Sequence, residues 1–287
     1  MGGIVLGLAG LGAFKATSKQ VSKYLIQACV IMLGLRLDLS TLAHSASRGL
    51  VLAVATIAGA LLLGLGLGKL LRSGKEISVL ISSGTAICGG SAIAAVGASI
   101  GASSSTIAVS TGAIFVLNAI GLWVLPAIGH ALHLTDVQFG EWAGVALHDI
   151  ATVTGAARGY HATPGAGSVA LDTANVVKLT RVLWIFPIAL VAGWVMKAGG
   201  RVRAPFPWFI LLFVAASGVR TWVPGSAGWG NAAGQYAATG FQVALFLIGT
   251  GLSRATLASV GWRALAQAAI LWVVMAGGAL VAIMARG

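Results

Sequence analysis

The sequence predicts an all-α, polytopic helical membrane protein. Hydrophobic residues make up 58% of its 287 residues and charged residues only 8%, against roughly 25% charged residues in a typical soluble domain. Glycine contributes 41 residues, about twice its usual share, and small residues let membrane helices pack closely. Too little polar surface remains to cover a water-soluble globule of this length. The composition therefore argues against a soluble enzyme, a nucleic-acid-binding module and a disulfide-stapled secreted domain.

Seven apolar stretches approach or exceed the roughly 20 residues that a helix needs to cross a bilayer. They cover residues 24–39, 49–71, 106–128, 169–197, 207–224, 236–251 and 262–285. Two further stretches, 77–100 and 137–160, are apolar but interrupted by glycine and small polar residues. The 169–197 run is long for one crossing, which predicts a tilted or divided helix. The opening stretch, 2–14, is too short to cross, so it is either a partial helix or the end of a longer segment.

Basic residues gather in three short clusters between apolar runs, as they do in cytoplasmic loops. The clusters are Lys15, Lys19 and Lys23; Lys69, Arg72 and Lys75; and Lys197, Arg201 and Arg203. All three fall on one side of the membrane whether the two interrupted stretches cross fully or enter and leave on the same side. Re-entrant stretches also place the loop with Asp136 and Glu141 on the opposite side. For this reason we favour re-entrant segments and keep full crossing as the alternative.

Two pairs of similar segments within the chain predict an inverted repeat. Residues 34–42 resemble residues 249–257, and each copy precedes an apolar helix. Residues 123–126 (WVLP) resemble residues 184–187 (WIFP), and each is expected to end the helix that follows an interrupted stretch. Inverted repeats with paired broken segments are typical of secondary transporters. The same spacing aligns four polar residues in pairs, Cys88 with Asp149 and Ser91 with Thr152.

The first interrupted stretch carries glycines, hydroxyls and a thiol at membrane depth. Non-helical backbone is tolerated there only where it lines a cavity or is buried in protein. A half-helix that begins near Gly89–Ser91 would aim free N–H groups and a partial positive charge at an anion. The alternative is close helix packing through small residues. The substrate-binding candidates in this stretch are Ser83, Thr85, Cys88, Gly89, Gly90 and Ser91.

The second interrupted stretch carries His148 and Asp149. An ionisable residue at the centre of a spanning helix costs at least ~2.5–3.5 kcal/mol, so it needs a reason. Histidine titrates near neutral pH, which makes the pair a candidate for proton coupling, with Thr152 as a supporting residue on the same helix face as His148. The alternatives are a buried polar cluster that holds helices together and a solvated pair at the surface. Asn118 either faces the same cavity or forms a helix–helix hydrogen bond.

Four polar residues on the next predicted helix are spaced three residues apart: Asp172, Asn175, Lys178 and Arg181. Neighbouring pairs share a face, but the whole set drifts around the helix. Lys178 and Arg181 are the natural cations for a dianionic ligand, and Arg suits bidentate contact with an oxyanion. The alternatives are a salt bridge with Asp149 or Asp172 and an Arg that extends to the membrane surface. Asn175 is assigned a supporting role.

Five short motifs occur in a fixed order along the chain. They are residues 33–37 (LGLRL), 83–92 (SGTAICGGSA), 148–149 (HD), 177–183 (VKLTRVL) and 207–209 (PWF). In this order they resemble the YeiH-type sulfate exporter family of membrane proteins. Members of that family often have Glu where this chain has Asp149, a shorter acid. The resemblance implies a multi-pass secondary carrier of the bacterial inner membrane, with a small oxyanion as its substrate class.

Taken together, these features predict a single membrane domain over 1–287, with scaffold-like helices in 24–71 and 207–285 and a core in 77–197. The expected function is secondary active export of an anion such as sulfate or sulfite, coupled to protons through His148 and Asp149. The alternatives are a sodium-coupled carrier of another small solute, and a channel or receptor without a coupled cycle. No nucleophile–base pair is evident, so an enzyme is not expected. No cofactor, metal or nucleic-acid partner is expected, and the glycine-rich faces permit a homodimer.

Overall fold

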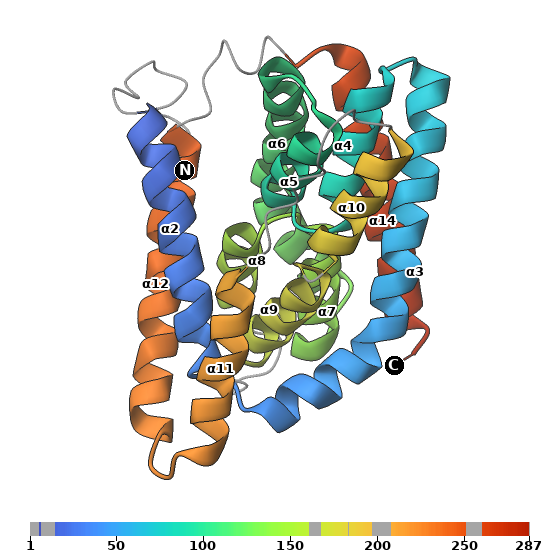
Figure 1. The fold of residues 1–287 in the computed structure, drawn as a ribbon. Coiled ribbons are helices and arrows are strands. Elements are labelled where there is room, and N and C mark those ends of the chain that lie inside the picture. The colour runs from blue at the N-terminus through green and yellow to red at the C-terminus, as the bar shows by residue number, and fades with distance from the viewer. Residues whose placement is uncertain are drawn as a thin grey trace. The chain divides into compact units, whose positions relative to one another are not determined.

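The computed structural model is built of α-helices throughout the part of the chain that it describes, which confirms the all-α class. That part comprises Leu6 and residues 15–160, 168–182, 184–196, 208–250 and 260–286. The helices are α2 (Lys15–Gly34), α3 (Leu39–Leu71), α4 (Lys75–Ala86), α5 (Gly90–Ile100), α6 (Ser104–Ala131), α7 (Asp136–Ala146), α8 (Ile150–Arg158), α9 (Val169–Val182), α10 (Ile185–Val195), α11 (Trp208–Trp222), α12 (Ala227–Thr250) and α14 (Trp262–Met284). Figure 1 shows their course.

Four helical stretches are long and apolar enough to cross a membrane. They are Ala53–Leu71, Ser105–Ala131, Val169–Val195 and Trp262–Met284, and they match four of the predicted crossings. Leu211–Trp222 is apolar but shorter. The predicted crossings at 24–39 and 236–251 fall in α2 and α12, which are not among the four. The protein is therefore a multi-pass helical membrane protein.

Several boundaries differ from those expected. The first basic cluster lies on helix α2 rather than in a loop, because residues 15–23 contain neither glycine nor proline to stop a helix. Helix α3 has 33 residues because it begins ten residues before the predicted crossing. The division of the 169–197 run, by contrast, is one of the two expected outcomes, since α9 ends at Val182 and α10 begins at Ile185.

The two similar segments that begin with Trp and end with Pro, residues 123–126 and 184–187, do not end helices. Pro126 lies inside α6, which continues to Ala131, and Pro187 lies in the first turn of α10, where proline is tolerated. The third basic cluster, in residues 197–203, lies outside the described residues. So do residues 251–257 of the segment that resembles residues 34–42. The inverted repeat therefore stays a prediction.

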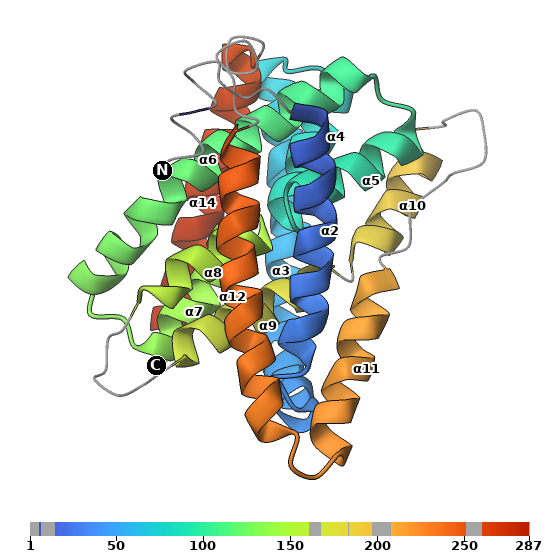
Figure 2. The ribbon, with the colours of Figure 1, turned by 90° about the vertical axis from the view of Figure 1, so that its left-hand side faces the viewer.

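The chain forms two compact units, each made of two stretches of sequence. The first comprises Met1–Arg48 and Pro207–Ala255, and the second comprises Gly49–Phe206 and Thr256–Gly287. In the first unit, α2 packs against both α11 and α12 (Figure 2). The second unit holds all of the predicted core together with most of α3 and all of α14, which the sequence had grouped with the scaffold.

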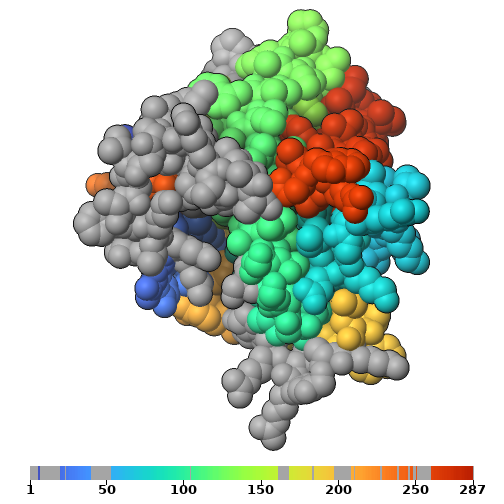
Figure 3. Space-filling view, turned by 90° about the horizontal axis from the view of Figure 1, so that it is seen from above, coloured from blue at the N-terminus to red at the C-terminus, as the bar shows by residue number. Residues whose placement is uncertain are grey.

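Within the second unit, α14 is tied to α3 and α4 by polar contacts. The Ser73 hydroxyl donates to the backbone carbonyl of Arg263 over 3.4 Å, and the Gln267 amide donates to the carbonyl of Gly64 over 2.9 Å. Figure 3 shows the turn between α3 and α4 against the start of α14. The last helix therefore belongs to the packing that surrounds the interrupted segments.

The first interrupted segment folds back on itself. Gly84 of α4 packs on Ile93 of α5, and one turn further from the break Leu80 of α4 approaches Gly97 of α5. The two contacts are symmetric about the break, so α5 returns alongside α4. At 12 and 11 residues, the two helices are about 16–18 Å long, roughly half of the ~30 Å hydrocarbon thickness. This is the geometry expected of a segment that enters and leaves on one side.

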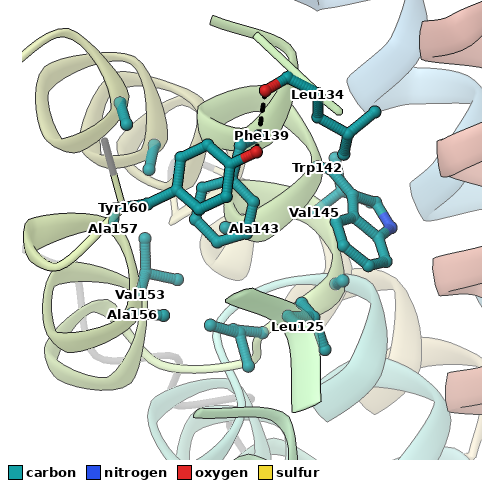
Figure 4. Close-up of a cluster of buried hydrophobic side chains, with 14 of the residues drawn as sticks. Leu125, Leu134, Phe139, Trp142, Ala143, Val145, Val153, Ala156, Ala157 and Tyr160 are labelled. Carbon is teal, nitrogen blue, oxygen red and sulfur yellow. Dashed lines mark hydrogen bonds between the residues drawn. The ribbon is translucent and has the colours of Figure 1, made fainter. Parts of the chain in front are cut away.

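The second interrupted segment has the same form. The rings of Phe139 on α7 and Tyr160, just after α8, stack with centroids 3.7 Å apart. Figure 4 shows them in a buried apolar cluster, where the Tyr160 hydroxyl donates to the carbonyl of Leu134 over 2.7 Å. Trp142 of α7 extends the cluster toward α14 by donating to the carbonyl of Ala276. The far ends of α7 and α8 are therefore held together, with the break at the opposite end.

Gly140 and Gly144 on α7 determine how closely α7 approaches α9, and we call these two positions the seam. A Cβ atom on Gly140 would lie 2.7 Å from the carbonyl oxygen of Ala170, and one on Gly144 would lie 2.8 Å from the Val177 side chain. Both contacts are too short for an added methyl group, so the two helices can approach this closely only with glycine at these positions. Gly66 of α3, by contrast, has open space where a Cβ would stand.

We expect Gly140→Ala and Gly144→Ala each to lower the midpoint of thermal unfolding in detergent. Overpacking of this kind costs roughly 1–3 kcal/mol, because α9 must shift away from α7. Gly66→Ala is the matched control, and it should leave the midpoint unchanged or raise it, since alanine favours helix by up to about 1 kcal/mol. Equal midpoints for all three variants would contradict the proposed seam.

Candidate functional site

The first break, residues 87–89 between α4 and α5, contacts the second break, residues 147–149 between α7 and α8. Gly89 in the first break has φ 65°, a conformation that side chains with a Cβ rarely adopt. A Cβ atom on Gly89 would lie only 3.1 Å from the Cβ of His148 in the second break. Glycine is therefore required here both for backbone conformation and for space. Helix α5 begins at Gly90, as the sequence predicted.

Asp149 ends the second break because it caps the N-terminus of α8. Its carboxylate accepts hydrogen bonds from the backbone N–H of Thr152 over 2.8 Å and from the Thr152 hydroxyl over 2.5 Å. A side chain that caps in this way marks the start of a helix, so His148 lies before α8 rather than on it. The expected shared helix face of His148 and Thr152 is therefore wrong, and Thr152 supports Asp149 instead.

Asn118, near the middle of α6, joins His148 to Asp149. Its side-chain oxygen accepts from the backbone N–H of His148 and lies 2.9 Å from His148 Nδ1, and its amide nitrogen donates to the Asp149 carboxylate over 2.5 Å. Because the backbone N–H can only donate, the Asn118 oxygen is the acceptor, and Nδ1 must carry the hydrogen toward it. In the neutral imidazole, Nε2 is then a bare lone pair. Nε2 is buried and has no hydrogen-bond partner among the described residues.

Lys178 of α9 lies between the C-terminal ends of both interrupted helices. Its ammonium group donates to the carbonyl of Leu147, next to the end of α7, over 2.5 Å and to the carbonyl of Ile87, next to the end of α4, over 3.4 Å. The side chain is 0% exposed. The last carbonyls of a helix lack partners within the helix and carry partial negative charge, so a cation at this point stabilises both ends.

Arg181, one turn further along α9, serves the first break. Its guanidinium donates to the carbonyl of Ala86, the last residue of α4, over 2.5 Å and to the Thr56 hydroxyl of α3 over 2.6 Å. At 1% exposure it does not extend to the surface, so that alternative is wrong. Among the described residues, every hydrogen bond of Lys178 and Arg181 goes to an uncharged oxygen, which differs from the predicted salt bridge with Asp149 or Asp172.

The remaining candidates fall into two groups. Ser83 donates to the carbonyl of Leu80 within α4, which is a local helix contact, and Ser91 is exposed. By contrast, three buried polar groups have no hydrogen-bond partner among the described residues: the Thr85 hydroxyl, the Asn175 amide nitrogen and Arg181 Nε. The side-chain oxygen of Asn175 accepts from the Thr154 hydroxyl over 2.8 Å. Natural proteins leave few buried polar groups unsatisfied, so their concentration among the predicted residues is informative.

Cys88 and Asp149 hold similar positions in the two breaks. The Cys88 thiol interacts with Ser91 and with the backbone N–H of Ala92, as the Asp149 carboxylate does with Thr152. Lys178 acts electrostatically on Cys88, His148 and Asp149, so these groups share one neighbourhood. The site therefore combines two basic side chains, Lys178 and Arg181, with a single acidic one, Asp149.

The sequence analysis missed Thr56 and the backbone carbonyls that receive Lys178 and Arg181. Thr56 stands in an otherwise apolar run, where a single threonine carries no signal. The carbonyls belong to Ala86, Ile87 and Leu147, whose apolar side chains give no indication of their role. Only the break geometry exposes these oxygens.

The chain matches the family model described as "Conserved hypothetical protein 698" over residues 3–268. It belongs to this family. Similar proteins are named UPF0324 membrane protein. That of Bacteroides thetaiotaomicron is 41% identical over 275 residues, covering 95% of this chain and 81% of the relative. That of Porphyromonas gingivalis is 40% identical over 288 residues, covering 98% and 86%.

A third UPF0324 membrane protein, from Geobacter sulfurreducens, is 41% identical over 282 residues, covering 98% of this chain and 88% of the relative. This is the same family as the YeiH-type proteins that the five motifs resemble, so the resemblance is confirmed. No solved structure matches the chain. The interrupted segments and the cations between them therefore lie within the region that the family shares.

We expect Asn118→Leu to lower the stability of the protein. The substitution leaves the buried backbone N–H of His148 and the Asp149 carboxylate short of partners, at a cost of roughly 1–3 kcal/mol for each unsatisfied group. Thermal unfolding in detergent measures this. Ser110→Ala is the control on the same helix, because the Ser110 hydroxyl is buried without a partner among the described residues and its loss costs little. Similar midpoints for Asn118→Leu and wild type would show that the amide does not support the second break.

Proposed function

We propose that the protein is a secondary active transporter of a small inorganic oxyanion, such as sulfate or sulfite, coupled to protons. The expected location is the bacterial inner membrane, and export is the direction that the family resemblance implies. The membrane-spanning architecture and the family membership support a transport role in general terms. The contacts of the site support the nature of the substrate and the coupling.

Unpaired hydrogen-bond donors among the site residues are the observation that carries the proposal. The Arg181 Nε–H, the Asn175 amide and the Thr85 hydroxyl are buried without partners in the described part of the chain. Two cations face one carboxylate in the same neighbourhood. An oxyanion offers several acceptor oxygens for the unpaired donors and a negative charge for the two basic side chains. A cation or a neutral apolar solute offers neither. The N-terminal ends of α5 and α8 add partial positive charge.

His148 supports coupling to protons. Its Nδ1 is engaged by Asn118, so a proton can be gained only at Nε2, which is buried without a partner among the described residues. Gaining that proton adds positive charge to a neighbourhood that already holds Lys178 and Arg181. An anion bound nearby would favour the protonated ring, and the protonated ring would favour the anion, which is the reciprocal linkage that cotransport requires.

The alternative of a sodium-coupled carrier has less support. Its Na⁺ ligands would be unwound carbonyls and Asp149, but Lys178 already donates to two of those carbonyls. A channel or a receptor would share the binding chemistry but not the coupled cycle. Flux measurements separate these cases, since a channel does not saturate at low substrate and a receptor binds without flux.

Uptake of radiolabelled sulfate and sulfite into proteoliposomes, with and without an imposed pH gradient, tests the proposal. We expect saturable uptake by the wild type that increases with the gradient. His148→Ala should lose the response to the gradient, because the proton-accepting Nε2 is removed. Ser110→Ala serves as the control and should retain it. Absence of flux of both anions under any gradient, from folded wild type, would reject the proposed substrate class.

Arg181→Lys tests the anion contact separately. Lysine keeps the charge and can still donate to the Ala86 carbonyl, but it lacks Nε and the planar guanidinium. We expect the apparent KM for the transported anion to rise about 30-fold or more, since losing a buried charged contact costs roughly 2–5 kcal/mol. Arg158→Lys, at an exposed position at the end of α8, should leave the KM unchanged. An unchanged KM in Arg181→Lys would remove Arg181 from the anion site.

A further inference from the structure

The Lys178 ammonium occupies a position that is built for a cation. The carbonyl of Leu147 lies at the C-terminal end of α7 and that of Ile87 at the C-terminal end of α4, and Lys178 Nζ donates to both. Each of these ends carries partial negative charge. Asp149 acts electrostatically on the same group, without a hydrogen bond to it among the described residues. The side chain is 0% exposed, so the contact is shielded from bulk solvent.

The same arrangement holds coupling ions in other secondary transporters. There, unwound carbonyls and the C-terminal ends of half-helices coordinate Na⁺ near the middle of the membrane. In this chain the corresponding oxygens are already engaged by a covalently attached ammonium. Lysine suits this role because its charge is compact and carries three donors, whereas the planar guanidinium of Arg181 instead joins the Ala86 carbonyl to Thr56.

We infer that Lys178 is a built-in cation that takes the place of a coupling sodium ion at the ends of α4 and α7. Two consequences follow. The protein needs no Na⁺ to hold its two breaks together or to transport its anion, and removal of the Lys178 side chain opens a site for a small monovalent cation. The statement on transport rests on the proposed function, whereas cation binding by the variant does not.

The competing interpretation is that Lys178 is only a structural anchor. In that case its truncation lowers stability, and no soluble ion restores it, because hydrogen bonding rather than charge is what was lost. The built-in cation makes the opposite prediction. A free ion can then bind the two carbonyls, with Asp149 acting on it only through its charge, and it raises the stability of the variant in proportion to its occupancy.

Thermal unfolding of purified protein in detergent distinguishes the two interpretations, with NaCl compared against choline chloride at equal concentration. We expect no difference for the wild type. We expect Lys178→Ala to unfold several degrees higher in NaCl than in choline chloride, with saturation as NaCl is raised. Lys69→Ala, which removes an exposed lysine at the end of α3, should behave as the wild type does. The double variant Lys178→Ala/Asp149→Asn should lose the sodium effect, because the carboxylate charge is gone.

A second variant covers the case in which Lys178→Ala does not fold in either salt. Lys178→Gln keeps an N–H donor for one carbonyl but lacks the charge, and we expect it too to be stabilised by NaCl over choline chloride. A folded variant that is insensitive to Na⁺, Li⁺ and K⁺ would overturn the inference, as would a sodium-dependent rise in the wild type. Failure of the proposed function would instead appear as absent anion flux in wild-type proteoliposomes, whatever the result in detergent.

Discussion

Two cations on successive turns of one helix make the interrupted architecture possible. Breaking α4–α5 and α7–α8 in the membrane leaves carbonyls without helical partners, at roughly 1–3 kcal/mol for each buried group left unsatisfied. Burying a lysine and an arginine is costly as well, unless each finds hydrogen-bond acceptors. Lys178 and Arg181 meet both requirements at once, since they donate to the carbonyls of Leu147, Ile87 and Ala86. The breaks and the two basic side chains therefore supply each other's hydrogen-bond partners.

In the proposed transport cycle, contact between the breaks is what would link a proton to the transported anion. His148 packs on Gly89 of the first break, while Asn118 holds both His148 and Asp149 of the second. A change of charge on the His148 imidazole therefore acts on the backbone of the first interrupted segment at Gly89 and on the helix cap of the second at Asp149. Such linkage requires two states with different contacts, and the close-packed seam of Gly140 and Gly144 favours movement of α7 and α9 as one body.

The sequence was most informative where polarity contradicts an apolar background. His148, Asp149, Lys178 and Arg181 could be identified because ionisable residues in membrane segments need a reason, and the structure brings all four into one neighbourhood. Their partners could not be identified, because backbone carbonyls have no residue type and their exposure depends on where a helix stops. The same limit explains the misplaced starts of α2 and α3 and the wrong helix face for His148, since a cap at Asp149 outweighs helical periodicity.

The last helix completes the second break. Trp272 of α14 donates to the carbonyl of Ala146, the final residue of α7, and Trp142 of α7 donates to Ala276 of α14. Ala146 and Trp272 are 126 residues apart, so at the ~5–20 residues per second of protein synthesis, the end of α7 waits about 6 to 25 s for its partner. During that time this carbonyl lacks its final hydrogen bond. The second break therefore reaches its final form only after α14 has been made.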